Sequence, residues 1–313
     1  MTARNAAGAA LLALLAALPF FVGEYPVALA VEVLIFGVFV LGINLLVGYT
    51  GLVTLGHALF IGLGGYGLGV FAVLFEFPVW IAMALSLLVV AVVALAVGAL
   101  CTRTTGVEFL LITLAFSEMF RGLAVKVQVT GGDDGMPGLS PPELAWLGLD
   151  SSDSTVFYYY VVAVSLLTLL TVWRVVNSPF GSVLVGIREN EKRMIALGYN
   201  VARYKIAAFT VSAVVSGVAG VLLAQKLRFV NPDIMTWQVS GEGLLMAIIG
   251  GRQAFLGPLA GAAFFILLKA ELAAITEEYI IFFGLVFMLV VALFRGGLVG
   301  FAEALLKRRP AAG

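Results

Sequence analysis

Ten long apolar runs dominate this sequence and leave very few architectures open to it. They cover residues 7–22, 27–47, 54–74, 79–101, 107–127, 156–176, 206–225, 241–253, 255–274 and 279–294. A helix of about twenty apolar residues crosses the roughly 30 Å hydrocarbon core of a bilayer and satisfies its own backbone there. Hydrophobic residues make up 62% of the 313 residues and charged residues only 12%, which is too little charge to cover a soluble fold. The sequence therefore predicts an all-α polytopic membrane protein, with about ten transmembrane helices in one domain over residues 1–313.

Some of these runs contain interruptions that predict irregular backbone inside the membrane. The run 241–253 is shorter than a full span and ends in Gly250 and Gly251, so we expect a short helix or a half-helix that re-enters the membrane. The stretch GYTGLVTLG at 48–56 predicts a broken backbone whose amides or carbonyls meet a polar substrate, by analogy with interrupted helices of other transporters. Pairs of small residues four apart predict close helix contacts: Gly65 with Gly69, Ser216 with Gly220, and Gly257 with Gly261.

The distribution of Lys and Arg predicts the orientation of the chain. If the spans alternate from a cytoplasmic N-terminus, the outer side holds only Arg121, Lys126, Lys226 and Arg228, and Lys269 lies inside a span. The cytoplasmic side then holds Arg4, Arg103, Arg174, Arg188, Lys192, Arg193, Arg203, Lys205, Arg252, Arg295, Lys307, Arg308 and Arg309. Because cytoplasmic loops carry the excess of basic residues, we expect both termini to be cytoplasmic.

The segment SPFGSVLVGIRENEKRMIALGYN, residues 178–200, is far more charged than its surroundings. Ser178 followed by Pro179 is typical of a helix start, and Gly198 is typical of a helix end. Glu189 and Arg193 stand four residues apart in the order that favours an ion pair on a helix. We therefore predict a cytoplasmic helix in this loop.

Two interpretations of this helix remain open from the pattern alone. The helix is either a solvated connector that follows the positive-inside rule, or a helix whose apolar face docks into a groove of another protein. The second interpretation rests on apolar residues that recur at helical intervals: Phe180, Leu184, Ile187 and Met194.

Polar residues inside the apolar runs are the candidates for a translocation path, because such residues are costly in a membrane. They are Asn44, Thr54, His57, Thr113 and Ser117. The competing interpretation is that each forms hydrogen bonds between helices. The sequence predicts no catalytic site, no metal site and no bound cofactor, because it has one His, one Cys and no G-x-x-x-x-G-K-[ST] phosphate loop.

Several blocks in order resemble one transporter family. Residues 177–205 are similar to the coupling loop of permease subunits, of the M type, from bacterial branched-chain amino acid ABC importers. Four further blocks resemble the same family, in the same order: GINLLVGYTGLVTLGHALFIGLGGYG (42–67), RTTGVEFLLITLAFSEMF (103–120), TGGDDGMPGL (130–139) and SGEGLLMAIIGGRQAFLGPLAGA (240–262). The resemblance implies a multi-pass subunit of the bacterial cytoplasmic (inner) membrane that passes branched-chain or other hydrophobic amino acids inward.

The resemblance also implies partners for this chain. These are a homologous second permease subunit, two cytosolic ATPase subunits that bind ATP and Mg, and an external substrate-binding protein. The chain is also expected to contact the lipid bilayer, and no nucleic acid is expected as a partner. The acidic outer loop 130–155, with Asp133 and Asp134, is expected to dock the binding protein together with 226–240. Residues 178–200 are expected to receive the motion of the ATPase through Phe180, Leu184, Ile187, Arg188, Glu189, Asn190, Glu191, Arg193, Met194 and Gly198.

Other functions remain open at this point. Related permeases move urea or short amides, so these are a near alternative substrate class. An ion-coupled secondary transporter that works alone is an alternative of a different class, although the sequence offers no acidic ion site for it. A membrane scaffold without transport would leave the ordered blocks unexplained.

Overall fold

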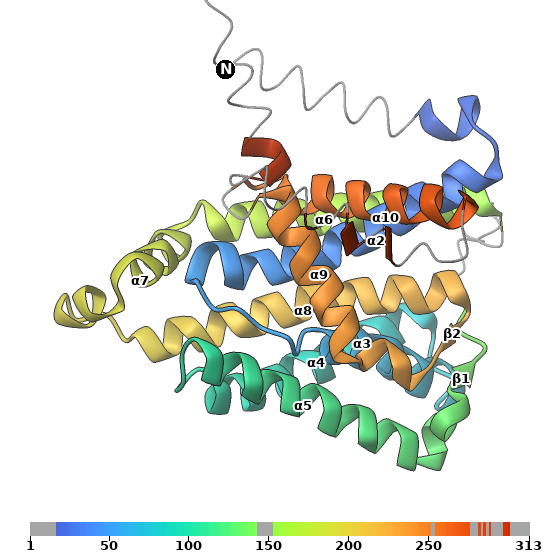
Figure 1. Cartoon of the computed structure of the whole chain (residues 1–313). Coiled ribbons are helices and arrows are strands. Elements are labelled where there is room, and N and C mark those ends of the chain that lie inside the picture. Colours follow the sequence, from blue (N-terminus) through green and yellow to red (C-terminus); the bar gives the residue numbers. More distant parts are fainter. Residues whose placement is uncertain are drawn as a thin grey trace, which may run out of the picture.

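The computed structural model describes residues 17–142, 153–251, 254–275, 281–282, 284–285, 288 and 297–300. The prediction of an all-α polytopic fold is confirmed (Figure 1). The principal elements are α2 (Glu24–Asn44), η1 (Leu45–Thr50), α3 (Ala58–Gly69), η2 (Val70–Leu74), α4 (Val79–Cys101), α5 (Val107–Lys126), η3 (Gln128–Thr130), η4 (Gly132–Asp134), β1 (Met136–Pro137), α6 (Ser154–Val176), α7 (Pro179–Ala196), α8 (Val201–Leu227), β2 (Phe229–Val230), η6 (Pro232–Met235), α9 (Trp237–Gly250) and α10 (Gly257–Ile275).

Five of the described helices are long and apolar enough to cross a membrane: Glu24–Thr50, α4, α6, α8 and α10. The apolar helix Ala58–Leu74 is shorter. The predicted runs 7–22 and 279–294 lie largely outside the described residues. The prediction of a short helix in 241–253 is confirmed, because α9 has 14 residues and ends at Gly250. At 1.5 Å per residue it is about 21 Å long, less than the thickness of the hydrocarbon core.

Helix α8 is the centre of the bundle, and α2, α3 and α4 pack around it (Figure 1). Small residues make these contacts possible, as the predicted pairs indicated. A Cβ atom on Gly220 of α8 would lie 2.0 Å from the carbonyl oxygen of Ile61 in α3. A Cβ atom on Gly261 of α10 would lie 1.9 Å from the carbonyl oxygen of Met246 in α9. Any larger side chain at either position would push two helices apart.

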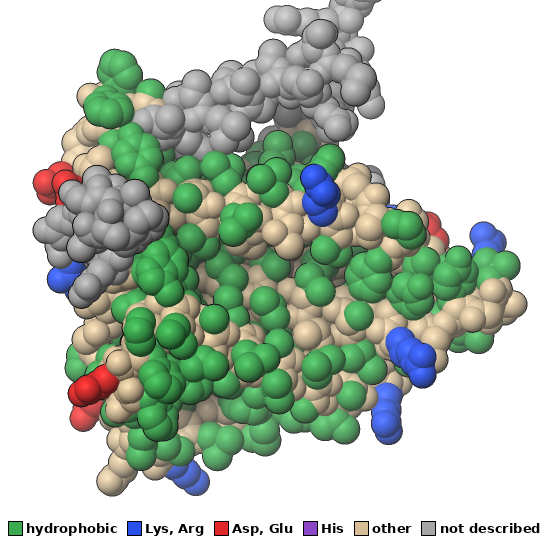
Figure 2. All heavy atoms as spheres, turned by 180° about the vertical axis from the view of Figure 1, so that it is seen from behind, with side chains coloured by type: hydrophobic (Ala, Val, Ile, Leu, Met, Phe, Trp, Pro, Cys, Tyr) green, Lys and Arg blue, Asp and Glu red, His purple; other side chains and the backbone are tan. Residues whose placement is uncertain are grey.

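The outward faces of α4 and α6 are hydrophobic. Their exposed side chains include Leu88, Val92 and Leu95 on α4 and Leu167 and Leu170 on α6. Figure 2 shows one whole face of the molecule covered mostly by hydrophobic side chains. Such a surface is suited to contact with lipid tails, which need no polar partner.

Two short strands join the outer loops that the sequence pointed to separately. Met136 pairs with Val230 and Pro137 with Phe229 in an antiparallel ladder. This ladder places the 130–142 part of the acidic loop beside the 226–240 loop. Helix α7 lies at the opposite end of the bundle, beyond the ends of α6 and α8 (Figure 1).

Candidate functional site

The charged segment between α6 and α8 folds as a kinked helix. Helix α7 begins after Ser178, with Pro179 in its first turn, and the chain then turns at Gly198 with φ +87°. The predicted start and end are therefore confirmed, although the Ser178 hydroxyl donates to the carbonyl of Val175 (2.6 Å) and caps no N–H group. Asn190, at φ −162° and ψ 95°, divides α7 into two helical pieces. Its side-chain oxygen accepts a hydrogen bond from Arg193 N (3.0 Å), as an N-cap of the second piece does.

The predicted ion pair between Glu189 and Arg193 is wrong. The kink at Asn190 lies between the two residues and destroys the helical spacing that would bring them together. Glu189 pairs instead with Arg188, whose Nη2 lies 2.6 Å from Oε1 of the carboxylate.

The apolar stripe of α7 packs on this chain, not on a partner. Leu184, Ile187 and Met194 are 0%, 3% and 9% exposed, within one hydrophobic cluster that includes Leu46 and Phe209. Phe180 stacks on Tyr204 with ring centroids 5.6 Å apart. The expectation that this stripe enters a partner's groove is therefore wrong, because the amphipathic face is already covered by the protein's own helices.

A different apolar group is exposed on α7 and the turn after it. Ile195, Leu197 and Tyr199 are 57%, 66% and 41% exposed. Lys192 and Arg193 are exposed on the same piece of helix. We call these five residues the α7 tip. These residues lie beyond the kink, on the second helical piece and the turn after it, whereas Met194 of the same piece is buried.

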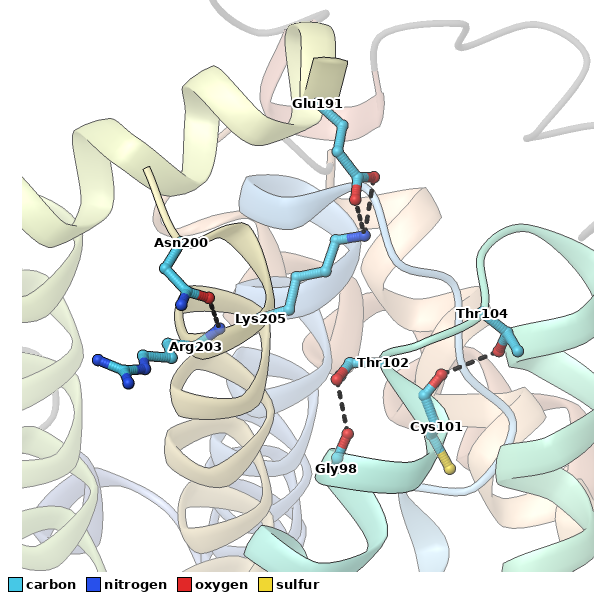
Figure 3. A network of polar contacts seen from close by, with 8 residues as sticks. All are labelled: Gly98, Cys101, Thr102, Thr104, Glu191, Asn200, Arg203 and Lys205. Atoms are coloured by element: carbon cyan, nitrogen blue, oxygen red, sulfur yellow. Dashed lines mark hydrogen bonds and ion pairs between the residues drawn. The ribbon is translucent and has the colours of Figure 1, made fainter. Parts of the chain in front are cut away.

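Two charged contacts fasten α7 to the bundle, one on each side of the kink. The Arg188 guanidinium donates to the carbonyl of Gly48 at the end of η1. Beyond the kink, Nζ of Lys205 in α8 lies 2.7 Å from both carboxylate oxygens of Glu191 (Figure 3). Lys205 is 2% exposed, so this pair holds a buried ammonium group. Movement of α7 is thereby tied directly to both η1 and α8.

The backbone break predicted at 48–56 is confirmed. The π-helix η1 ends at Thr50, Gly51 has φ +74°, and regular helix resumes at Ala58. A Cβ atom on Gly51 would lie 3.1 Å from Cγ of Arg188, so the arginine of α7 lies directly over the break. The interrupted segment therefore runs from the α7 contact into the core.

His57 is buried at the inner end of this break and is held by a complete hydrogen-bond chain. The Ser212 hydroxyl donates to the carbonyl of Gly42 (2.6 Å), so it accepts from Nε2 of His57 (2.6 Å). The Thr54 hydroxyl accepts from the N–H of Gly56 (3.1 Å), so it donates to Nδ1 of His57 (3.2 Å). Both nitrogens of a neutral imidazole are satisfied in this way. The geometry favours the interpretation of His57 and Thr54 as links between α2, α3 and α8.

The remaining candidates for a translocation path are also buried. Ser117 donates to the carbonyl of Met235 (2.8 Å) and Thr113 to that of Leu110 (2.9 Å). Asn44 is 1% exposed, and its side-chain oxygen has no hydrogen-bond partner in the part of the chain that the structure describes. A role in translocation stays a prediction for all five residues: Asn44, Thr54, His57, Thr113 and Ser117.

Sequence reasoning missed two serines that complete the core. Ser212 binds His57, and Ser240 of α9 accepts a hydrogen bond from the N–H of Ala58 (2.8 Å). Both are fully buried on apolar helices. The sequence marks each of these serines only as a hydroxyl among small and apolar residues of a helix. That pattern indicates little in a sequence with so many small residues.

Asp133 and Asp134 lie in η4, at the end of the bundle opposite α7 (Figure 1), and are exposed. The β1–β2 ladder brings their loop next to 226–240, which agrees with the expected joint surface. Docking of a binding protein there stays a prediction. The other acidic residues of the predicted 130–155 loop include Glu143 and Asp150, which lie outside the described residues.

Comparison with known proteins gives the family of this chain. Residues 25–309 match the family model described as branched-chain amino acid transport system / permease component. No solved structure matches the chain significantly. Curated relatives include the high-affinity branched-chain amino acid transport system permease protein LivM of Salmonella typhimurium, 30% identical over 293 residues, which covers 86% of this chain and 67% of the relative.

The LivM protein of Escherichia coli strain K12 is 29% identical over 291 residues, with the same coverage of both chains. A probable branched-chain amino acid transport permease protein LivM of Methanocaldococcus jannaschii is 26% identical over 141 residues, covering 44% of this chain and 40% of the relative. The family match spans nearly all the described helices, and the fold is that of a multi-pass membrane protein. The chain therefore belongs to the family of branched-chain amino acid transport system permease components.

Proposed function

We propose that this chain is a permease subunit of an ATP-driven importer that moves branched-chain amino acids into the cytoplasm. In this proposal a second, homologous permease pairs with it in the membrane. Two cytosolic ATPase subunits bind ATP and Mg and supply the energy, and an external binding protein delivers the substrate. Family membership supports the transport role and the substrate class.

The observation that carries the proposal is the structure of α7. A helix that projects from the bundle, exposes Ile195, Leu197 and Tyr199, and is fastened to the core by charged contacts is suited to receive a force from another protein. Burial of such side chains in a partner's groove would contribute about 1–3 kcal/mol each. A transporter that worked alone, driven by an ion gradient, would have no use for this exposed apolar group.

The test is reconstitution of the chain with a homologous second permease, two ATPase subunits and a binding protein from the same organism. We expect ATP-dependent uptake of radiolabelled leucine, isoleucine or valine into vesicles, and ATPase activity that rises when loaded binding protein is added. Uptake of urea or acetamide in place of leucine would identify the substrate as a short amide. Uptake that follows a proton or sodium gradient without ATPases would contradict the proposal.

A further inference from the structure

Helix α9 carries a carboxylate for which the described residues provide no ion-pair partner. Glu242 lies five residues after the start of α9 at Trp237 and is partly exposed. It takes part in none of the ion pairs found within the described residues, unlike Glu32, Glu118, Glu189 and Glu191. Among the described residues, Glu242 is therefore a partly exposed acid without an ion-pair partner.

Contacts of the neighbouring residues place Glu242 between the two ends of the bundle. Ser117 of α5 binds the carbonyl of Met235, just before α9 begins. Nine residues separate Ser117 from the outer end of α5 at Lys126, which is about 13 Å of helix. From that level α9 continues inward, and Ser240 binds the N–H of Ala58 where helix resumes after the break. Glu242 is two residues further on. With Lys126 at one surface of the membrane, this level is near the middle of a hydrocarbon core about 30 Å thick.

The outward surface around Glu242 leaves room for another helix. Figure 1 shows α9 crossing the front of the bundle, between α10 and α5. A Cβ atom added to Gly241 of α9, or to Gly122 of α5, would meet nothing within 4 Å. Small residues at the surface of a membrane helix allow a second helix to approach closely. We call the surface of Glu118, Gly122, Gln238, Gly241 and Glu242 the α5–α9 face.

A series of polar groups leads from the outer loops to this carboxylate. Glu118 forms an ion pair with Arg121 (2.8 Å) and accepts a hydrogen bond from the N–H of Trp237 (3.3 Å). Arg121 also interacts electrostatically with Asp133 and Asp233 of the outer loops. Gln238 is exposed one helical turn before Glu242. Polar side chains thus continue from the outer surface to mid-membrane depth on this face.

A carboxylate at this depth is incompatible with lipid tails, so it faces protein, water or a cation. The exposed faces of α4 and α6, by contrast, are hydrophobic and suited to lipid. The two kinds of surface therefore have different neighbours in the membrane. The α5–α9 face requires a polar environment that another membrane subunit and an enclosed pathway would provide.

Resting on the proposed function, we infer that the α5–α9 face pairs with the second permease and that Glu242 faces the substrate pathway enclosed between the two subunits. A branched-chain amino acid crosses as a zwitterion, and its side chain needs only apolar surface. Its ammonium group needs an anion at the point where water is excluded. The carboxylate of Glu242 supplies that anion.

Charge reversal on a fixed side chain tests the role of Glu242 in the complete importer. The starting protein carries Cys101→Ser, which removes the one native cysteine, and then Glu242→Cys. We expect leucine uptake to fall about ten- to a hundredfold in this variant. Modification with a sulfonatoethyl thiol reagent should restore uptake, and a trimethylammonioethyl adduct of similar size should not. Uptake that stays normal in Glu242→Gln and is indifferent to the sign of the adduct would overturn the inference.

Cross-linking tests the pairing surface, with a matched control on α4. A cysteine at Gly241 should cross-link to the second permease, whereas one at Val92, which is 58% exposed on α4, should not. Cross-linking through Val92 and not Gly241 would overturn the assignment of the face. Leucine uptake by the unmodified complex tests the proposed function separately, because it does not depend on which face pairs.

Discussion

The ammonium group of Lys205 lies 2.7 Å from both carboxylate oxygens of Glu191, across fourteen residues of sequence and from one helix to the next. Lys205 is almost completely buried, whereas the Glu191 side chain is 39% exposed. The pair therefore joins the core of the bundle to the part of α7 that reaches solvent. A change on the exposed side of this pair acts on a buried charge.

Replacement of Glu191 by Gln should destabilise the protein by leaving the Lys205 ammonium without its anion. We expect a loss of about 1–3 kcal/mol in the free energy of unfolding, measured by thermal unfolding in detergent. Lys192→Gln, at an exposed neighbouring position, is the control and should change little. The double variant Glu191→Gln with Lys205→Met should recover part of the lost stability, because no unpaired charge remains. Equal stability of Glu191→Gln and the control would contradict the role of the pair.

The α7 tip should bind the ATPase subunits. Leu197→Asp places a charge in the centre of the exposed apolar group, so co-purification of the ATPases should be lost while thermal stability stays unchanged. Ile187→Ala should instead lower the thermal stability of the protein, without removing any side chain of the α7 tip. That side chain is 3% exposed inside the bundle, and its truncation should cost about 2–5 kcal/mol of stability. Normal assembly and transport by the Leu197 variant would exclude the tip as the docking surface.

The expected orientation places the two ends of the bundle on opposite sides of the membrane. In a Cys101→Ser background, a cysteine at Ser140 should react with an impermeant thiol reagent in intact cells. Cysteines at Lys192 and at Ala311 should react only after the membrane is permeabilised. The reverse order of labelling would show the opposite orientation in the membrane and contradict the prediction from the Lys and Arg distribution.

Asp133 and Asp134 should contribute to docking of the external binding protein through opposite charge. Replacement of both by Lys should weaken the binding measured at low ionic strength, and added salt should reduce the difference between variant and original protein, because exposed charges are screened. The assembled membrane complex should stay intact. Equal binding at low salt would remove these two residues from the interface.

Much of this fold follows from patterns within single segments. The apolar runs marked the helices, the glycines at 48–56 and at Gly250 marked the interruptions, and Gly198 marked a helix end. Each of these signals depends on residues that are close together in the sequence, where helix length and backbone freedom decide the outcome.

The parts that sequence reasoning missed depend on residues far apart. His57 and Ser212 are 155 positions apart, and their contact exists only because α3 and α8 pack closely. The apolar stripe of α7 was assigned to a partner for a related reason: Ile187 and Met194 are buried in one cluster with Leu46 and Phe209, which are distant in the sequence.

The ladder between Met136 and Val230 closes the chain from β1 to β2 into a ring. Helices α6 and α8 form the two sides of that ring, and α7 connects them at the end opposite the strands (Figure 1). The ladder lies in the same loop as Asp133 and Asp134, and α7 lies at the opposite end, so one closed loop of polypeptide connects the two ends of the bundle. We expect a pull at either end of the bundle to be shared by α6 and α8 in parallel.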